Sequence, residues 1–293
     1  MSTLGPGVWG VVATPYDRKL HVDHDSLRRL VGHYAVIGVS GLTVLGVFGE
    51  AAALSRAERA SVLRTVRETA DLPLVVGLTA LATAPACEEA DAALAAAGDR
   101  VAALMVQVNS PVADTVAAHL NEVATHTGTP VVIQDYPIAS GVTIPTAALR
   151  DVVAAVPATA AVKAEAPPTP PAIAALSALG VPVFGGLGGI GLLDELSCGA
   201  AGAMTGFSYP EALVACVRAY REGGYPAARA VFAPYLPLVN FEQQARIALA
   251  VRKECLRARG LIADAAVRPP AAALPGALRK PLRDHLDAVE ALA

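Results

Sequence analysis

The feature that most constrains the fold is a repeated alternation of short apolar runs with alanine-rich segments of helical length. Each run is apolar almost throughout, which is typical of strands that are covered on both faces of a parallel sheet. Repetition of strand and helix along one chain predicts βα units around such a sheet. The eight runs are VWGVVATP (8–15), GLTVLG (41–46), LPLVVGL (72–78), RVAALMVQ (100–107), TPVVIQDYP (129–137), TAAVKAEA (159–166), VPVFGG (181–186) and GAAGAMTG (199–206).

Helix start signals lie between these runs. Asp25 or Ser26 precedes LRRLVGHYAVIG, and Ser55 stands three residues before Glu58 in the pattern of a capping box. Eight successive pairs of strand and helix predict an α/β fold of the (β/α)8 TIM barrel type.

The predicted barrel occupies residues 1–208, and residues 209–293 form a C-terminal helical region packed on it, because no strand-like run follows residue 208. A chain of 293 residues that is 54% hydrophobic can bury a large core without disulfides or metal ions.

Charge, cysteine and histidine patterns exclude several classes of function. The balance of 23 basic and 26 acidic residues does not favour a nucleic acid or an anionic membrane as partner. The start of the chain lacks a secretory leader pattern, and no apolar stretch reaches the ~20 residues of a membrane span. The four cysteines have no CxxC spacing and the six histidines show no ligand spacing, so we expect no metal site and a cytoplasmic location.

Polar residues at the ends of the predicted strands are the candidates for chemistry, because TIM barrels carry their catalytic groups at the C-terminal ends of strands. These candidates are GVFGE (46–50), Gln107 and Asn109, QDYP (134–137), Lys163 with Glu165, and GGLGGIG (185–191).

Lys163 is the most informative of them, because the chain has only four lysines and this is the one within a predicted strand. An unpaired ammonium in a barrel interior costs several kcal/mol, which favours the neutral amine. A neutral amine can attack a carbonyl carbon and form an imine. The structural alternatives are an ion pair with a nearby carboxylate and a strand-end lysine whose ammonium reaches solvent.

The order of GVFGE, QDYP and VKAEA, followed by a helical C-terminal extension, resembles the dihydrodipicolinate synthase and N-acetylneuraminate lyase family over nearly the whole chain. In that family a sixth-strand lysine forms a Schiff base with pyruvate or another 2-oxo acid, and Lys163 matches its position. The resemblance implies a small-molecule 2-oxo acid substrate, no cofactor, and a homo-oligomer of two or four subunits.

The fifth strand departs from the family pattern. The family has a tyrosine there that relays protons, whereas this chain has Gln134, whose amide does not titrate near neutral pH. Tyr136, two residues on, points to the same face by strand alternation and is a candidate substitute; the alternative is a rim aromatic that packs over a loop. Glu165 shares a strand face with Lys163, and burial beside an imine would favour its protonated form; the alternative is a simple counter-ion of Lys163.

The GVFGE loop also departs from the family, which has two threonines where Val47 and Phe48 stand. Backbone N–H groups of such a loop still bind anions, so we expect the loop to bind substrate through Val47, Phe48 and Gly49. Gly186 in the seventh-strand loop and Met204 in the eighth strand complete the predicted substrate-binding set. The final residue of the loop, Glu50, is expected to be a structural carboxylate beneath it; the alternative is that it orients residues that contact the substrate.

Two further departures argue against a role in lysine biosynthesis. Ala139 stands where dihydrodipicolinate synthases have an arginine for the second substrate, and VQVNSP lacks the tyrosine that they share with a neighbouring subunit.

The segment GLGGIG (186–191) matches the dinucleotide pattern GxGxxG. That fingerprint normally opens the first βαβ unit and is followed by an acidic residue about 20 positions on. Here it lies at the seventh strand and the next run ends in AMTG, so we do not expect a nicotinamide cofactor.

Together these features predict a lyase of the class I aldolase type, an aldolase or a dehydratase, that acts on pyruvate or another small 2-oxo acid. Lys163 would form the imine, Glu165 or Tyr136 would move protons, and Gln134 would hold a substrate oxygen. The alternative is a barrel that has lost turnover and binds a metabolite as a sensor or partner subunit.

Overall fold

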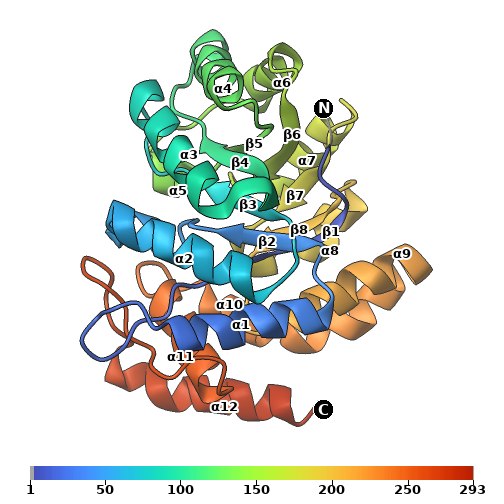
Figure 1. Ribbon diagram of the computed structural model, residues 1–293. Coiled ribbons are helices and arrows are strands. Elements are labelled where there is room, and N and C mark those ends of the chain that lie inside the picture. Colours follow the sequence, from blue (N-terminus) through green and yellow to red (C-terminus); the bar gives the residue numbers. More distant parts are fainter. Residues whose placement is uncertain (1–2, 293) are drawn as a thin grey trace.

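The computed structural model describes residues 3–292 and forms a closed barrel of eight parallel strands in sequence order (Figure 1). Each strand lies within its predicted run, except that the first begins one residue earlier, at Gly7. The predicted (β/α)8 fold is therefore confirmed. The strands are β1 (Gly7–Val11), β2 (Gly41–Val44), β3 (Leu74–Gly77), β4 (Val101–Gln107), β5 (Val131–Asp135), β6 (Thr159–Ala164), β7 (Val183–Gly185) and β8 (Gly202–Thr205).

Helices follow the strands around the outside of the barrel, and three more follow the last barrel helix. The α-helices are α1 (His24–Ile37), α2 (Arg56–Thr69), α3 (Thr83–Ala97), α4 (Ala113–Thr127), α5 (Pro137–Ser140), α6 (Thr146–Ala155), α7 (Thr169–Ser177), α8 (Leu192–Ser197), α9 (Pro210–Phe232), α10 (Leu236–Glu242), α11 (Ala248–Ala258) and α12 (Arg279–Glu290). Short 3-10 turns are η1 (Ala51–Ala53), η2 (Gly98–Arg100), η3 (Leu187–Gly189), η4 (Ala233–Tyr235) and η5 (Gly276–Leu278).

The first two helices begin with side-chain caps. In α2 the predicted capping box is present, with Ser55 and Glu58 each accepting the other's backbone N–H. The prediction that α1 starts after Asp25 or Ser26 was wrong. Its cap is Asp23, which is in an extended conformation and accepts the Ser26 N–H, so that Asp25 lies within the first turn.

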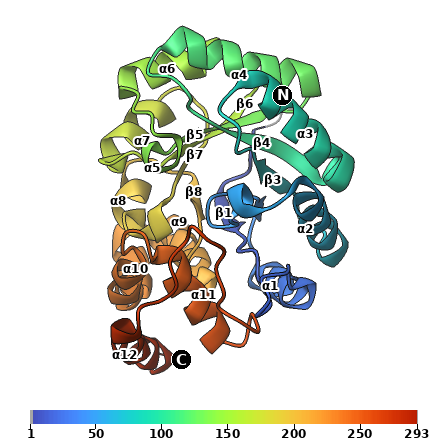
Figure 2. The same cartoon turned by 90° about the vertical axis from the view of Figure 1, so that its left-hand side faces the viewer.

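Helix α9 packs against β1, β8, α1 and α8, which is the place of the eighth barrel helix. The helices that lie beyond the barrel are therefore α10, α11 and α12, which gather on one side of it near α1 (Figure 2). We call residues 233–292 the extension. The proposed division of the chain at residue 208 stays a prediction.

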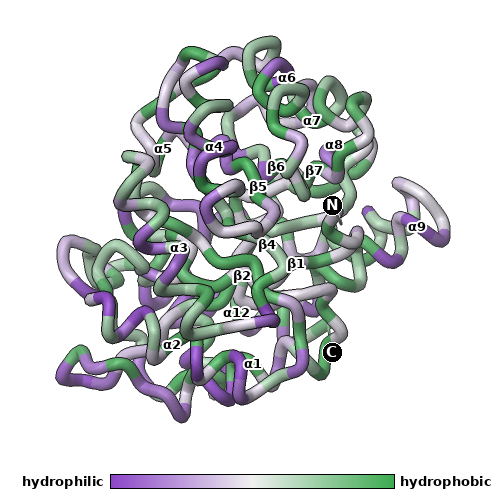
Figure 3. Tube along the Cα trace, turned by 45° about the horizontal axis from the view of Figure 1, so that its top comes forward, coloured by the Kyte–Doolittle hydropathy of each residue, from purple (hydrophilic) through white to green (hydrophobic). Residues whose placement is uncertain are grey.

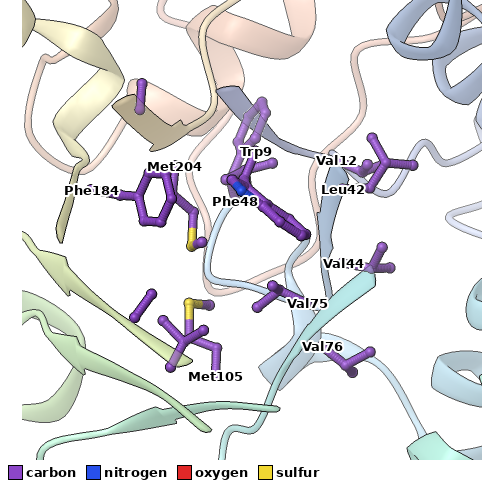
Figure 4. Packing of buried hydrophobic residues seen from close by; sticks show 14 of the residues in the cluster. Trp9, Val12, Leu42, Val44, Phe48, Val75, Val76, Met105, Phe184 and Met204 are labelled. Atoms are coloured by element: carbon purple, nitrogen blue, oxygen red, sulfur yellow. The ribbon is translucent and has the colours of Figure 1, made fainter. Parts of the chain in front are cut away.

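The core is one continuous apolar cluster that includes the barrel interior and the strand–helix interface. Figure 3 shows hydrophobic colouring along the central strands and hydrophilic colouring on outer stretches such as α1 and the far end of α9. Inside the barrel, Met204, Phe184, Met105 and Phe48 lie in this cluster (Figure 4). These side chains close the barrel interior, so a ligand site must lie at one of its ends.

Buried charges attach the extension to the first two βα loops. Lys253 of α11 is fully buried and donates to the carboxylate of Glu50, which also accepts the Arg268 N–H at 2.9 Å. The Arg268 guanidinium in turn pairs with Glu58 of α2. These contacts fix the position of α11 over the C-terminal ends of the strands.

Candidate active site

A cavity of about 240 Å³ lies at the C-terminal ends of the strands, beneath α11 and the segment that precedes it. This end of the barrel is where TIM-barrel enzymes carry their sites. The volume is below the ~300–1,000 Å³ typical of sites for drug-sized ligands, which favours a small metabolite. The lining residues are Val11, Val47, Phe48, Gln134, Tyr136, Lys163, Glu165, Leu187, Gly188, Thr205, Gly206, Gln243, Arg246, Ala248, Leu249 and Arg252.

Lys163 enters the cavity from β6, a strand whose other residues are buried apolar or small side chains. Its side chain is only 7% exposed, and its Nζ lies 3.1 Å from Oε2 of Glu165, whose side chain is equally buried. The register of β5 against β6 pairs Gln134 with Lys163. The strands therefore bring an amine, a carboxylate and an amide to one wall.

Glu165 is held in place from several directions. Gln134 donates its side-chain amide N–H to Oε2 of Glu165 at 2.8 Å. The backbone N–H of Glu165 donates to the Asp135 carbonyl at 2.9 Å. A Cβ on Gly186 would overlap the Glu165 carboxylate, so a glycine at this position leaves the space that the carboxylate occupies. Gln134 therefore orients the carboxylate that faces Lys163.

Tyr136 also lines the cavity, at the single position between β5 and α5, where it is the N-cap residue of α5. Burial, followed by the negative charge of Glu165, raises the pKa of the Tyr136 phenol above its ordinary value. The hydroxyl therefore keeps its proton at neutral pH and can donate a hydrogen bond to an anion or a substrate oxygen.

Two further buried carboxyl groups lie near Glu165 but do not line the cavity. Burial and the Glu165 charge raise the pKa of Asp135 to about 6. Burial raises the pKa of Glu195 to about 7, with a further increase from Glu165 and an opposing hydrogen bond from Thr169. One oxygen of each carboxyl has no hydrogen-bond partner within residues 3–292.

The five residues predicted to bind substrate do not all reach the cavity. Val47 and Phe48 line it, whereas Gly49, Gly186 and Met204 do not. The N–H of Gly49 donates to Gly46 inside the loop, and its carbonyl accepts the Thr14 hydroxyl at 2.7 Å. Gly186 lies behind Glu165, and Met204 is fully buried in the core.

The polar groups at the outer side of the cavity come mainly from the extension, which contains none of the predicted site residues. Gln243, Arg246 and Arg252 line it, together with Thr205 at the end of β8. Thr205 accepts the Gly188 N–H at 2.7 Å. The sequence carried no signal for these residues, because their approach depends on how α11 docks.

No group of three or more His, Cys, Asp or Glu side chains that could hold a metal ion occurs in the part of the chain that the structure describes. Over the same residues, no helix combines the length and the apolar character needed to cross a membrane. The GLGGIG segment begins after β7, passes through η3 and leads into α8, a helix of only six residues.

Comparison with known proteins places these features in a family. The sequence profile of the Dihydrodipicolinate synthetase family matches residues 5–289. A crystal structure of dihydrodipicolinate synthase from Rhodopseudomonas palustris superposes with a TM-score of 0.90 at 28% identity, covering 98% of this chain and 99% of that one.

Curated relatives carry names for different reactions. L-2-keto-3-deoxyarabonate dehydratase from Azospirillum brasilense is 28% identical over 278 residues, 90% of this chain and 88% of that protein. A 4-hydroxy-tetrahydrodipicolinate synthase from Porphyromonas gingivalis is 29% identical over 140 residues. That match spans 47% of each chain, about half the length of the relative.

Proposed function

Because the chain belongs to the dihydrodipicolinate synthetase family, we propose that it is a lyase that joins Lys163 to a small 2-oxo acid as a Schiff base. The observation that carries the proposal is the buried Lys163 amine beside a cavity, with a carboxylate oxygen of Glu165 3.1 Å from Nζ. A purely structural lysine has no need of a cavity beside its amine.

Imine formation requires that the Lys163 ammonium gives up one proton and that the departing hydroxyl receives one. Glu165 is close enough to Lys163 to carry out both transfers. The Lys163 ammonium passes a proton to Glu165, and the neutral amine then adds to the keto carbon. The hydroxyl of the resulting carbinolamine departs as water with the proton that Glu165 returns. An iminium and an ionised Glu165 carboxylate remain.

The iminium withdraws electrons from C3 of the bound acid, which allows either of two cleavages. In a retro-aldol step the C4 hydroxyl loses its proton while the C3–C4 bond breaks, giving an aldehyde and an enamine. In a dehydration C3 loses a proton, and the enamine then expels the C4 hydroxyl. Glu165 is the base in both cases, and the Tyr136 phenol donates a hydrogen bond to the departing oxygen.

We propose a substrate other than that of 4-hydroxy-tetrahydrodipicolinate synthase. Ala139 stands at the position of that enzyme's arginine and lies exposed in α5, away from the cavity. The similarity, over 90% of this chain, to a protein named L-2-keto-3-deoxyarabonate dehydratase supports a hydroxylated 2-oxo acid as the substrate class.

We also propose that the chain assembles as a homo-oligomer of two or four copies, as the family resemblance implies. Light scattering coupled to size-exclusion chromatography would report the mass. A mass of one chain at micromolar concentration would contradict the assembly without affecting the chemistry of the site.

Borohydride trapping tests the proposed function. The protein is incubated with each member of a panel of small 2-oxo acids, reduced, and weighed by mass spectrometry. We expect one reduced adduct per chain with at least one acid. Absence of an adduct with every acid, despite binding detected by calorimetry, would instead favour a barrel that binds a metabolite without converting it.

A further inference from the structure

We propose that Arg252, a residue of the extension, binds the carboxylate of the 2-oxo acid, so that anion recognition in this site comes from α11 rather than from the loop after β2. This inference rests on the proposed function, because it assigns a role to a residue in the same cavity.

Arg252 is nearly buried but poorly satisfied. Its side chain is 11% exposed, and its one ion pair, within residues 3–292, joins Nε to Oε2 of Glu242 at 3.4 Å. No hydrogen bond of the guanidinium is found over those residues, and Nε is buried without a partner. A guanidinium has five N–H donors in a planar fork, so most of this binding capacity is unused.

Glu242 does not account for the remaining donors. Its fully buried carboxylate already accepts the hydroxyl and the N–H of Ser208, and its ion-pair contact with Arg252 is at Nε. The terminal nitrogens of the guanidinium make no hydrogen bond to Glu242, so they remain available to a ligand. Glu242 is therefore suited to orient the fork.

Gln243 adds a second unsatisfied donor at the same place. Its Nε2 is buried and has no hydrogen-bond partner over residues 3–292. Both side chains meet at Gly188, whose φ is +67°. A Cβ there would overlap the Gln243 amide and lie 2.8 Å from a terminal nitrogen of Arg252. Gly188 thus leaves room for two donors that converge on the cavity.

Arg252 lies over Phe48, in a loop that offers the substrate carboxylate no side-chain hydrogen-bond donor at Val47 or Phe48. Phe48 and Val47 carry no hydroxyl, and the Phe48 ring packs against Gly206. The guanidinium lies over this ring, 5.4 Å from its centroid, which is a cation–π distance. An aromatic wall beneath an arginine lowers the local dielectric and strengthens a charge-assisted hydrogen bond to a carboxylate.

The charges of the cavity agree with an anionic ligand. Its charged lining groups are Lys163, Arg246, Arg252 and Glu165, so cations outnumber anions. Of the two arginines, Arg246 is exposed, whereas Arg252 is only 11% exposed and is paired with Glu242 at Nε. Arg252 is therefore the arginine that can meet a substrate carboxylate in a site largely closed to water.

The test compares two ligands that share a keto group and differ in charge. Pyruvate has the carboxylate, whereas methyl pyruvate presents a neutral ester to the same position. The half-saturating concentration for adduct formation on Lys163 is measured with each ligand by cyanoborohydride trapping. The variants are Arg252→Met, Arg252→Lys and, as a control on the same helix, Arg257→Met, whose arginine pairs with Glu254 and does not line the cavity.

We expect Arg252→Met to raise the half-saturating concentration of pyruvate by about 10- to 100-fold, the usual effect of losing a charged hydrogen bond. Methyl pyruvate should change by less than about 2-fold, because it has no charge for Arg252 to bind. Arg252→Lys should lie between, and Arg257→Met should match the parent protein. Equal losses with both ligands would show a structural role and overturn the proposal, as would no loss with either.

Two other outcomes are separated by adding 2-oxoglutarate, which has a second carboxylate, as a third ligand and by measuring pyruvate binding with calorimetry. An effect confined to 2-oxoglutarate, with pyruvate unchanged, would overturn the assignment to the carboxylate beside the keto group and move it to a distal one. If the parent protein forms no adduct, the proposed function fails, and calorimetric binding of pyruvate then decides the role of Arg252. Equal affinity of the parent and Arg252→Met would overturn it.

Discussion

Over residues 3–292 the molecule buries two lysine–carboxylate pairs, and they differ in what surrounds the amine. Lys253 donates to Glu50 and to the Ala266 carbonyl at 2.9 Å, and it lies 4.2 Å from the centroid of the Tyr16 ring. Burial lowers the pKa of Lys253 below its ordinary value, while Glu50 opposes that change. This amine is enclosed and has its partners within the protein.

Lys163 is also buried, but it faces a cavity and has one ion pair, with Glu165, over residues 3–292. The comparison teaches that burial alone does not identify a reactive lysine. The distinguishing features are space beside the amine and a carboxylate that can exchange a proton with it.

The largest effect is expected from Lys163→Met. Without the amine no imine forms, so the reduced adduct should disappear and turnover should fall by at least ~10³-fold. Lys280→Met is the matched control, because that lysine is 77% exposed on α12. Trapping and turnover assays check both variants, and an adduct that persists in Lys163→Met would contradict the assignment.

The next largest effect tests the role of the Glu165 carboxylate separately from that of the Lys163 amine. Glu165→Gln keeps the side-chain shape but removes the proton acceptor, so turnover should fall by about 10²- to 10⁴-fold. Adduct formation over long incubation should survive, because Lys163 is intact. Turnover close to that of the parent would show that Glu165 serves only as a counter-ion.

Lys253→Met tests the enclosed pair. It leaves Glu50 buried and uncompensated, so the free energy of unfolding should fall by about 3–5 kcal/mol. Urea denaturation measures this change, and Lys163→Met should cost less because its partner faces a cavity. Adding Glu50→Gln should recover part of the loss. Equal costs for the two lysines would erase the distinction between the pairs.

The smallest effect concerns Glu195, behind the reactive pair. Burial raises its pKa from an ordinary 4.5 to about 7 in the folded protein. Below pH 4.5 both states hold the proton, and between pH 4.5 and 7 only the folded state does. Stability contributed by this proton is therefore lost as the pH rises, by about 3 kcal/mol at most.

Replacing Glu195 with Gln should remove that loss. The drop in melting temperature between pH 5 and pH 8 should be smaller in Glu195→Gln than in the parent, as differential scanning calorimetry would show. Subtracting the drop in Glu195→Gln from the drop in the parent isolates the titration of Glu195 from that of other groups in the same pH range. An identical drop in both proteins would contradict the raised pKa.

The fold could be predicted from the sequence because each strand is a continuous apolar run bounded by turns. The positions of Lys163, Glu165, Gln134 and Tyr136 followed from strand alternation, and all four line one cavity. Strand alternation does not tell which residue along a strand is the first to reach the cavity. Met204 was therefore predicted at the site, whereas its neighbour Thr205 lines it.

The contribution of the extension could not be predicted, because it depends on docking between distant segments. Arg252 and Lys253 are adjacent in α11, yet one faces the cavity and the other is enclosed against the barrel. Which of two neighbouring cations reaches a site is decided by the rotation of the helix. The contact of Lys253 with Glu50, 203 positions apart, fixes that rotation.

The most direct test of the difference between the two pairs is a peptide map of the parent protein after reduction with a 2-oxo acid that gives an adduct. The four lysines, Lys19, Lys163, Lys253 and Lys280, are then compared within one sample. We predict that the reduced adduct is found on Lys163, with Lys253 unmodified and the exposed lysines at background. Modification spread over Lys19 and Lys280, or found on Lys253, would contradict the account.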